Sequence, residues 1–197
     1  MKRPAAVFLD RDGVIIEDGG YVADAEQVRL LPGAAQAIAA LNRAGWHVVV
    51  VTNQSGIARG YFSPTALEEV HDRLKQLLWC YGASLDAIYV CPHHPDGVID
   101  DYREACHCRK PQPGLLLQAA ADLQLDLSQC WLIGDRPSDL EAGAQAGCRT
   151  VLVRTGFGKH VDTVALDRTR LRLELVATDL ADAVCKLGLD RQHRCAA

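Results

Sequence analysis

Short apolar runs rich in β-branched residues alternate along this sequence with segments of helical periodicity. The apolar runs are Ala5–Leu9, Trp46–Val51, Ala87–Val90, Cys130–Ile133 and Thr150–Val153. Runs of this kind are typical of strands that are buried on both faces of a parallel sheet. The helical segments between them are Gly33–Ala44, Pro64–Tyr81, Pro113–Leu123 and Ser138–Ala146. The alternation predicts a doubly wound, Rossmann-like α/β fold, in which helices cover both faces of a mainly parallel sheet.

The rest of the chain extends this pattern without adding a second unit. Leu171–Ala177 and Asp179–Leu187 predict one more strand and one more helix. A chain of 197 residues is long enough to bury a substantial core. We therefore expect one domain over residues 1–190 and a frayed tail over 191–197, with no large cap domain inserted between strands.

Composition excludes several classes of partner. The formal net charge of −4 argues against a protein that binds the phosphate backbone of nucleic acids. No apolar segment approaches the roughly 20 residues that a membrane-spanning helix needs. The N-terminal Met1-Lys2-Arg3-Pro4 leads directly into the first strand without an apolar signal core. We expect a cytoplasmic, monomeric protein that binds neither nucleic acid nor membrane.

Polar residues follow the predicted strands where each strand ends. These groups are Asp10-Arg11-Asp12-Gly13, Thr52-Asn53-Gln54-Ser55-Gly56 and Gly134-Asp135-Arg136-Pro137-Ser138-Asp139. A long stretch from Cys91 to Pro113 also delivers Arg109-Lys110-Pro111 just before a helix. Ligands of open α/β sheets bind beyond the carboxyl ends of the strands, so these groups are predicted to share one site.

Phosphoryl transfer is the chemistry that these residue types support together. Asp10 could attack phosphorus and form an aspartyl phosphate, while Asp12 serves as general acid and then general base. Asp10, Asp135 and a backbone carbonyl near Asp12 offer the oxygen ligands that Mg²⁺ prefers. Thr52 and Lys110 could neutralise the phosphoryl oxygens. Each residue alone could be a cap, a turn or a solvated side chain, but their joint order at successive strand ends favours a catalytic site.

A second cluster combines cysteine and histidine. Cys91 and His93 are followed, after twelve residues, by Cys106 and Cys108. Three thiols and one imidazole suit a tetrahedral structural Zn²⁺. Such an ion would pin the long loop and hold Arg109-Lys110 at the site. His94 and His107 are interpreted as neighbours of this cluster and not as ligands.

The strand-end groups resemble the four motifs of the haloacid dehalogenase-like (HAD) phosphatase superfamily. In that resemblance Asp10 matches the nucleophile, Asp12 the acid/base, Thr52 the second motif, Lys110 the third and Asp135 the Mg²⁺-binding fourth. The similarity extends to about Val153. Neither gap between the motifs is expected to hold an inserted domain, so the chain is similar to the capless type.

Together with the zinc cluster, the motifs are similar to those of the D,D-heptose 1,7-bisphosphate phosphatases. That resemblance implies a sugar bisphosphate substrate that loses its C7 phosphate, in the synthesis of heptose precursors for lipopolysaccharide and related glycoconjugates. It also implies that the residues matching the family's substrate contacts do the same here, namely Asp18, Gly19, Gly20, Tyr21, Arg109 and Arg136. We expect further substrate contacts from Thr52, Asn53, Gln54, Ser55 and Lys110. Arg109 could bind the phosphate that is not cleaved.

Three other functions remain open at this stage. Histidinol-phosphate phosphatases share the zinc loop and the Asp-Arg-Asp-Gly motif, although their stretch between the two ligand pairs is usually shorter than Asp96–Ala105 makes it here. A signalling receiver domain would carry its phosphorylated Asp after a middle strand, whereas Asp10 follows the first strand here and has Asp12 beside it. A zinc-stabilised binding protein would leave the convergence of Asp10, Asp12 and Asp135 without a purpose.

Overall fold

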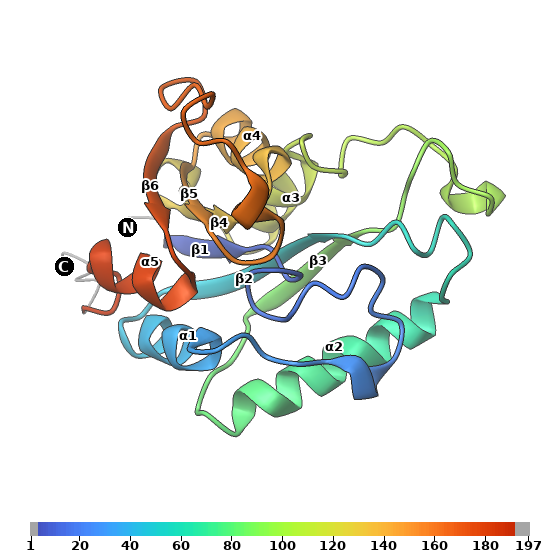
Figure 1. Cartoon of the computed structure of the whole chain (residues 1–197), viewed down its shortest axis with the longest axis horizontal. Helices are drawn as coiled ribbons and strands as arrows, with labels where there is room; N and C mark the ends of the chain where they lie inside the picture. Colours follow the sequence, from blue (N-terminus) through green and yellow to red (C-terminus); the bar gives the residue numbers. More distant parts are fainter. Residues whose placement is uncertain (1–3, 192–197) are drawn as a thin grey trace.

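A computed structural model describes residues 4–191 and contains one six-stranded parallel sheet (Figure 1). The strand order is β3-β2-β1-β4-β5-β6. The strands are β1 (Ala6–Leu9), β2 (His47–Asn53), β3 (Ala87–Cys91), β4 (Trp131–Gly134), β5 (Arg149–Val153) and β6 (Leu173–Ala177). Every predicted strand is therefore present, and the predicted parallel α/β sheet is confirmed.

The helices occupy both faces of the sheet, as the alternation predicts. They are α1 (Ala34–Arg43), α2 (Pro64–Trp79), α3 (Gly114–Asp122), α4 (Pro137–Ala146) and α5 (Leu180–Lys186). Figure 1 shows α1, α2 and α5 on one face, and α3 and α4 on the other. Short 3-10 turns lie at Ala25–Gln27, Asp100–Tyr102, Leu127–Gln129 and Gly156–His160.

Local signals explain where several of these helices begin and end. The Ser63 side chain accepts a hydrogen bond from the Ala66 backbone N–H and caps α2, whose first residue is Pro64. Gly147 follows α4 with a φ of 93°, a left-handed conformation that favours glycine at a helix end.

The central strands form the core of the molecule. All four residues of β1 are completely buried, and Val48–Val51 of β2 are likewise buried. Strands covered on both faces need apolar side chains in both directions, which explains why these segments lack the polar alternation of a half-exposed strand.

The strand order reverses between β1 and β4, which places a crevice beyond their carboxyl ends. The chain moves outward from β1 through β2 to β3 and then returns to pair β4 with the other side of β1. Ligands of doubly wound sheets bind at this topological switch point. Asp10 and Asp135 each follow directly after one of the two strands.

Within residues 4–191, no segment between strands folds into a further domain. The long connection from Cys91 to Gly114 contains only one 3-10 turn. No helix in this described part of the chain has the length and apolar character needed to cross a membrane. Of the predicted frayed tail, residues 192–197 lie outside the described residues.

Candidate active site

Three buried carboxylates meet at the switch point. Asp10 follows β1, Asp135 follows β4, and Asp139 lies in the first turn of α4. One oxygen from each lies within 4.8 Å of the others. Their exposed fractions are 6%, 0% and 1%, and Oδ1 of Asp135 has no hydrogen-bond partner among residues 4–191. Oxygen ligands that are this close, buried and incompletely paired fit a divalent cation such as Mg²⁺.

The protonation of the cluster reflects its concentration of negative charge. Burial, followed by the charges of Asp10 and Asp139, raises the pKa of Asp135 to about 7. Burial likewise raises the pKa of Asp10 to about 6, against the opposing charge of Lys110. Without further positive charge, the site disfavours full ionisation of its carboxylates.

Lys110 supplies one positive charge to this cluster. Its Nζ lies 2.7 Å from Asp10 Oδ1 and 2.7 Å from Asp139 Oδ1, and it donates a hydrogen bond to the Val51 carbonyl at 2.8 Å. Burial opposes the charge of Lys110, but the two carboxylates outweigh burial and raise its pKa. The side chain is therefore a fixed ammonium beside Asp10.

Asn53 fixes the backbone of Lys110. Its Oδ1 accepts a hydrogen bond from the Lys110 N–H, and its Nδ2 donates one to the Lys110 carbonyl, each at 3.0 Å. This reciprocal pair ties the end of β2 to the end of the long loop. The loop thus delivers Lys110 to the sheet edge, as the sequence predicts.

Asp12 lies beside the cluster with both carboxylate oxygens engaged. Arg11 Nη2 donates to both oxygens at 2.9 Å, and Gln54 Nε2 donates to Oδ2 at 2.8 Å. Gln54 Nε2 also donates to Thr52 Oγ1 at 2.9 Å. The residues after β1 and β2 thus form one network around Asp12.

Gly13 allows the turn after β1 to pass close to the acidic cluster. Its φ of 80° is left-handed, and a Cβ at this position would lie 2.3 Å from Asp135 Oδ2. Any larger residue would be strained and would also collide with that carboxylate. The glycine is therefore required by both the backbone and the site.

A cavity of about 790 Å³ opens onto these groups. Its lining includes Asp10, Asp12, Asp18, Gly20, Tyr21, Thr52, Asn53, Ser55, Arg59, His94, Arg109, Lys110, Pro111, Arg136, Ser138 and Asp139. The volume lies within the usual range for small-molecule sites. Asp18 and Arg136 form an ion pair of 3.0 Å at this cavity.

Most residues predicted to bind substrate line the cavity, with two exceptions. Gln54 is only 4% exposed and points to Asp12 and Thr52. Gly19 is exposed and does not belong to the lining. The structure therefore gives Gln54 the position of a residue that orients Asp12, and it leaves Gly19 outside the site.

Two lining residues, Arg59 and His94, lie outside the groups that the sequence predicted to share the site. Asp139 belongs to one of those groups, but no metal-binding or catalytic role was predicted for it, although its spacing of four residues from Asp135 could have identified it as a further acid. Arg59 Nη2 lies 3.0 Å from His94 Nε2. Burial and the charges of Arg109 and Arg59 lower the pKa of His94, so the positive charge in this part of the cavity comes from the two guanidinium groups. We call Arg59, His94 and Arg109 the basic group.

The predicted zinc ligands converge as a second cluster. One ligand atom from each of Cys91, His93, Cys106 and Cys108 lies within 4.8 Å of the others. The sulfurs of Cys106 and Cys108 are 3.2 Å apart, and none of the three cysteines forms a disulfide. A tetrahedron of thiolates around zinc has edges of about 3.8 Å, so the donor set is compact enough for that ion.

His93 is oriented toward this cluster by its other ring nitrogen. His93 Nε2 lies 3.2 Å from Glu104 Oε1, while Nδ1 lies 3.3 Å from Cys108 Sγ. A carboxylate on the outer nitrogen leaves the inner nitrogen free to bind metal. This cluster lies immediately before Arg109 and Lys110 in the chain.

Family models and relatives agree on the ancestry of the chain. The haloacid dehalogenase-like hydrolase model matches residues 7–69, and the HAD-hydrolase-like model matches residues 107–183. A D-glycero-D-manno-heptose-1,7-bisphosphate 7-phosphatase from Thermosynechococcus vestitus is 44% identical over 188 residues, which cover 93% of this chain and 95% of that protein. The corresponding β-anomer phosphatase of Escherichia coli K12 is 43% identical and covers 79% and 82% of the two chains.

Solved structures give the same result at the level of the fold. The D,D-heptose 1,7-bisphosphate phosphatase from B. bronchiseptica, complexed with magnesium and phosphate, superimposes with a TM-score of 0.82 at 39% identity, covering 93% of this chain and 97% of the other. A phosphatase of the same description from Burkholderia thailandensis gives a TM-score of 0.69 at 32% identity, with 94% and 98% coverage. With its carboxylate cluster at the switch point and relatives matched over nearly their whole length, this chain belongs to the D,D-heptose 1,7-bisphosphate 7-phosphatase family of haloacid dehalogenase-like hydrolases.

Proposed function

We propose that the chain hydrolyses the C7 phosphate of D-glycero-D-manno-heptose 1,7-bisphosphate through an aspartyl phosphate on Asp10. The observation that carries this proposal is the meeting of Asp10, Asp135 and Asp139 beside Lys110 at the switch point. The relatives named for this reaction support the choice of substrate.

In the first step, a carboxylate oxygen of Asp10 attacks the phosphorus of the C7 phosphate. The bond between phosphorus and the sugar oxygen breaks, and that oxygen takes the electron pair. Asp12 gives its proton to the departing oxygen. Lys110 holds Asp10 in place and balances charge on the phosphoryl oxygens, to which the Thr52 hydroxyl could donate a hydrogen bond.

In the second step, the ionised Asp12 removes a proton from water. The water oxygen attacks the phosphorus of the aspartyl phosphate, and the bond to Asp10 breaks. Inorganic phosphate leaves, and both aspartates return to their starting states. Gln54 and Arg11 keep the Asp12 carboxylate in one orientation through both proton transfers.

Asp10, Asp135 and the carbonyl of Asp12 would hold Mg²⁺, with Asp139 beside them. When bound, the ion reduces the repulsion between the anionic phosphate and the carboxylates and polarises the phosphoryl group. This assignment extends the sequence prediction, because Asp139 lies in the same group of oxygens.

The phosphate that is not cleaved would bind to the basic group of Arg59, His94 and Arg109. Arg109 donates a hydrogen bond to the His93 carbonyl at 3.3 Å, so its guanidinium has further donors for a ligand. Asp18, Gly20, Tyr21 and Arg136 would contact the sugar from the other part of the lining. A substrate with two phosphates thus matches a cavity with two phosphate-binding groups.

We also propose that Cys91, His93, Cys106 and Cys108 hold one structural zinc ion. The support is the compact donor set and the Glu104 contact that orients His93. The ion would link the end of β3 to the residues just before Arg109. The protein would act as a monomer, which light scattering of the purified chain can test.

The experiment compares three substrates and one variant. With Mg²⁺ present, kcat/KM should be about 100-fold higher for heptose 1,7-bisphosphate than for histidinol phosphate. Only the bisphosphate has one phosphate for Lys110 and a second phosphate for the basic group of Arg59, His94 and Arg109. Asp10→Asn should abolish phosphate release, since an amide cannot replace the attacking carboxylate. Heptose 7-phosphate should show an intermediate kcat/KM, because it lacks the second phosphate.

Asp101→Asn is the matched control, because Asp101 is exposed and outside the cavity lining. It should leave phosphate release unchanged. A preference for histidinol phosphate would disprove the heptose substrate, and full activity in Asp10→Asn would disprove the aspartyl phosphate.

A further inference from the structure

Arg11 is completely buried between two cavities. One side of its guanidinium contacts Asp12, through Nη2 at 2.9 Å to both oxygens and Nε at 3.2 Å to Oδ1. On the other side, Nη1 lies 3.2 Å from His71 Nε2. A guanidinium has only donors, so the contact with His71 requires that Nε2 accepts. The proton of the neutral imidazole then lies on Nδ1.

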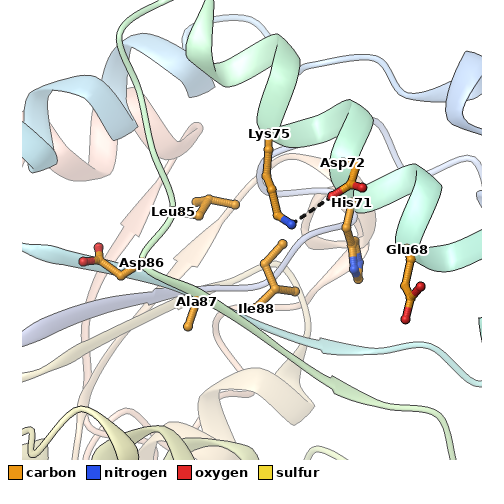
Figure 2. Close-up of a pocket in the computed structure, with 8 residues that line it drawn as sticks. All are labelled: Glu68, His71, Asp72, Lys75, Leu85, Asp86, Ala87 and Ile88. Carbon is orange, nitrogen blue, oxygen red and sulfur yellow. Dashed lines mark hydrogen bonds and ion pairs between the residues drawn. The ribbon is translucent and has the colours of Figure 1, made fainter.

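His71 belongs to α2 and lines a second cavity of about 450 Å³ between this helix and β3. Figure 2 shows its ring reaching from the helix toward Ile88 of the sheet, next to Lys75 and Asp72. The active-site cavity has Asp12 in its lining and does not include His71. Arg11 therefore links a residue of the second cavity to the acid/base of the first.

His71 is suited to be an acceptor because it is held neutral. Burial, followed by the charges of Arg11 and Lys75, lowers its pKa to about 3, and Asp72 opposes this only in part. An imidazolium would carry a proton on Nε2 and repel the guanidinium. The neutral ring instead offers a lone pair toward Nη1.

The position of Arg11 depends on this contact. Within residues 4–191, the structure records no hydrogen-bond partner for Nη1 other than His71. A buried guanidinium that lost an acceptor would rotate or shift to recover one, because an unpaired buried donor is costly. Such a shift would move the Asp12 carboxylate, which shares three contacts with the same group.

We propose that His71 is a positioning residue for proton transfer, which acts through Arg11 to hold the Asp12 carboxylate in its working orientation. The inference rests on the proposed acid/base role of Asp12 and extends it to a residue outside the active-site cavity. His71 itself touches neither substrate nor the phosphoryl group. Its influence should therefore appear only in steps that need a proton from Asp12.

The test compares leaving groups of different proton demand. The sugar alkoxide of heptose bisphosphate needs a proton in order to leave, whereas the aryloxide of p-nitrophenyl phosphate leaves without one. The parameter kcat/KM includes only steps up to formation of the phosphoenzyme, so the later hydrolysis does not affect it. His71→Leu should lower kcat/KM for the sugar substrate about tenfold, a part of the typical contribution of general acid catalysis, and lower that for p-nitrophenyl phosphate less than about twofold.

His71→Gln is the conservative variant, because its side-chain oxygen can reach the position of Nε2 and accept from Arg11. It should restore kcat/KM for the sugar substrate to within about threefold of the wild type. Equal losses with both substrates in His71→Leu, or no recovery in His71→Gln, would show a packing role only and overturn the proposal.

Asp12→Asn separates this inference from the proposed mechanism. Alone, it should show the same selective loss for the sugar substrate in larger measure, and adding His71→Leu should cause no further selective loss. A further loss in the double variant would overturn the role of His71 while leaving that of Asp12 intact. Equal losses on both substrates in Asp12→Asn alone would overturn the acid role of Asp12 and, with it, this inference.

Discussion

His71 is the one buried histidine among residues 4–191, and named neighbours determine its charge state. Its side chain is 8% exposed and faces the permanent charge of Arg11. Lys75 lies on the same helix and adds positive charge, while Asp72 partly offsets it. The folded protein therefore binds no proton at His71 near neutral pH, where an unfolded chain would begin to bind one.

Acid should destabilise the protein through His71. Its pKa is lowered to about 3 in the folded state, against the ordinary histidine value of 6.5 that applies in the unfolded chain. The unfolded state binds the extra proton below pH 6.5, so the stability is present above that pH and is lost as pH falls toward 3. Between pH 7.5 and 5.0 the wild type should lose about 2 kcal/mol relative to His71→Gln, because the slope approaches about 1.4 kcal/mol per pH unit only below pH 6.5.

The measurement is urea unfolding of both proteins at pH 7.5, 6.5, 5.5 and 5.0. Other titrating groups are shared by the two proteins, so the difference in unfolding free energy isolates His71. A difference that does not change with pH would show that His71 is protonated normally in the folded state.

At the residue scale, the sequence predicts the identity of the site residues better than their contacts. Asp10 and Asp12 follow an apolar strand, and burial alone requires them to lie at its end. The contacts of Gln54 are harder to predict, because its amide could hydrogen-bond to several neighbours. Which neighbour it contacts depends on side-chain rotamers and on the spacing of β1 and β2. Nothing in the order of residues distinguishes an amide that contacts substrate from one that holds Asp12.

At the scale of elements, the strands and helices are predictable because the hydrophobic pattern and the residues that start or end helices agree. The β1 and β2 segments are apolar on both faces, and Ser63-Pro64 marks the start of α2. The basic group of Arg59, His94 and Arg109 was not predictable in this way, since its members come from two segments that approach only in the folded chain. Residues far apart in sequence give no sign of proximity when each lies in an irregular loop.

The long loop between β3 and α3 contains His93, Cys106 and Cys108 of the cysteine cluster. Residues 92–113 contain a single 3-10 turn, Asp100–Tyr102, and carry Arg109 and Lys110 near their C-terminal end. An irregular segment of this length has a large conformational entropy to lose. A metal bound by four side chains of the loop and β3 would supply that stabilisation.

Cys108→Ser should remove the zinc and displace the two basic residues that follow it. Metal analysis should find about one zinc per wild-type chain and far less in the variant, since a hydroxyl is a poor zinc ligand. The phosphatase rate should fall about 100-fold, because even a small displacement of Lys110 misaligns Asp10. The loop should also become sensitive to limited proteolysis near Arg103.

Cys80→Ser is the matched control, because Cys80 is exposed and lies at the end of α2. Zinc content and rate should stay at wild-type values in that variant. Retention of zinc and of full activity in Cys108→Ser would contradict the pinning of the loop.

At the scale of the whole molecule, the carboxylate cluster is expected to lower the stability of the fold when no cation is bound. Asp135 is completely buried and has an oxygen without a hydrogen-bond partner among residues 4–191. It lies next to two further acids, and only the one ammonium of Lys110 bridges Asp10 and Asp139. Such an arrangement is costly in the absence of a cation and stabilising in its presence.

Asp135→Asn should therefore abolish the stabilisation of the protein by Mg²⁺. The amide oxygen can still accept from the Phe157 N–H, which donates to Asp135 Oδ2 at 2.6 Å, while the uncharged group relieves the repulsion from Asp10. In EDTA, the variant should melt at a higher temperature than the wild type, even though it cannot catalyse the reaction. At 100 times its Kd, Mg²⁺ should stabilise the wild type by about 2.7 kcal/mol, or about 5–10 °C in Tm, and should leave the variant almost unchanged. Differential scanning calorimetry with and without Mg²⁺ measures both effects, and Asp101→Asn should follow the wild type throughout. A variant that melts below the wild type in EDTA would mean that the Asp135 carboxylate stabilises the fold without a cation, and the carboxylate cluster would then be a structural network instead of a metal site.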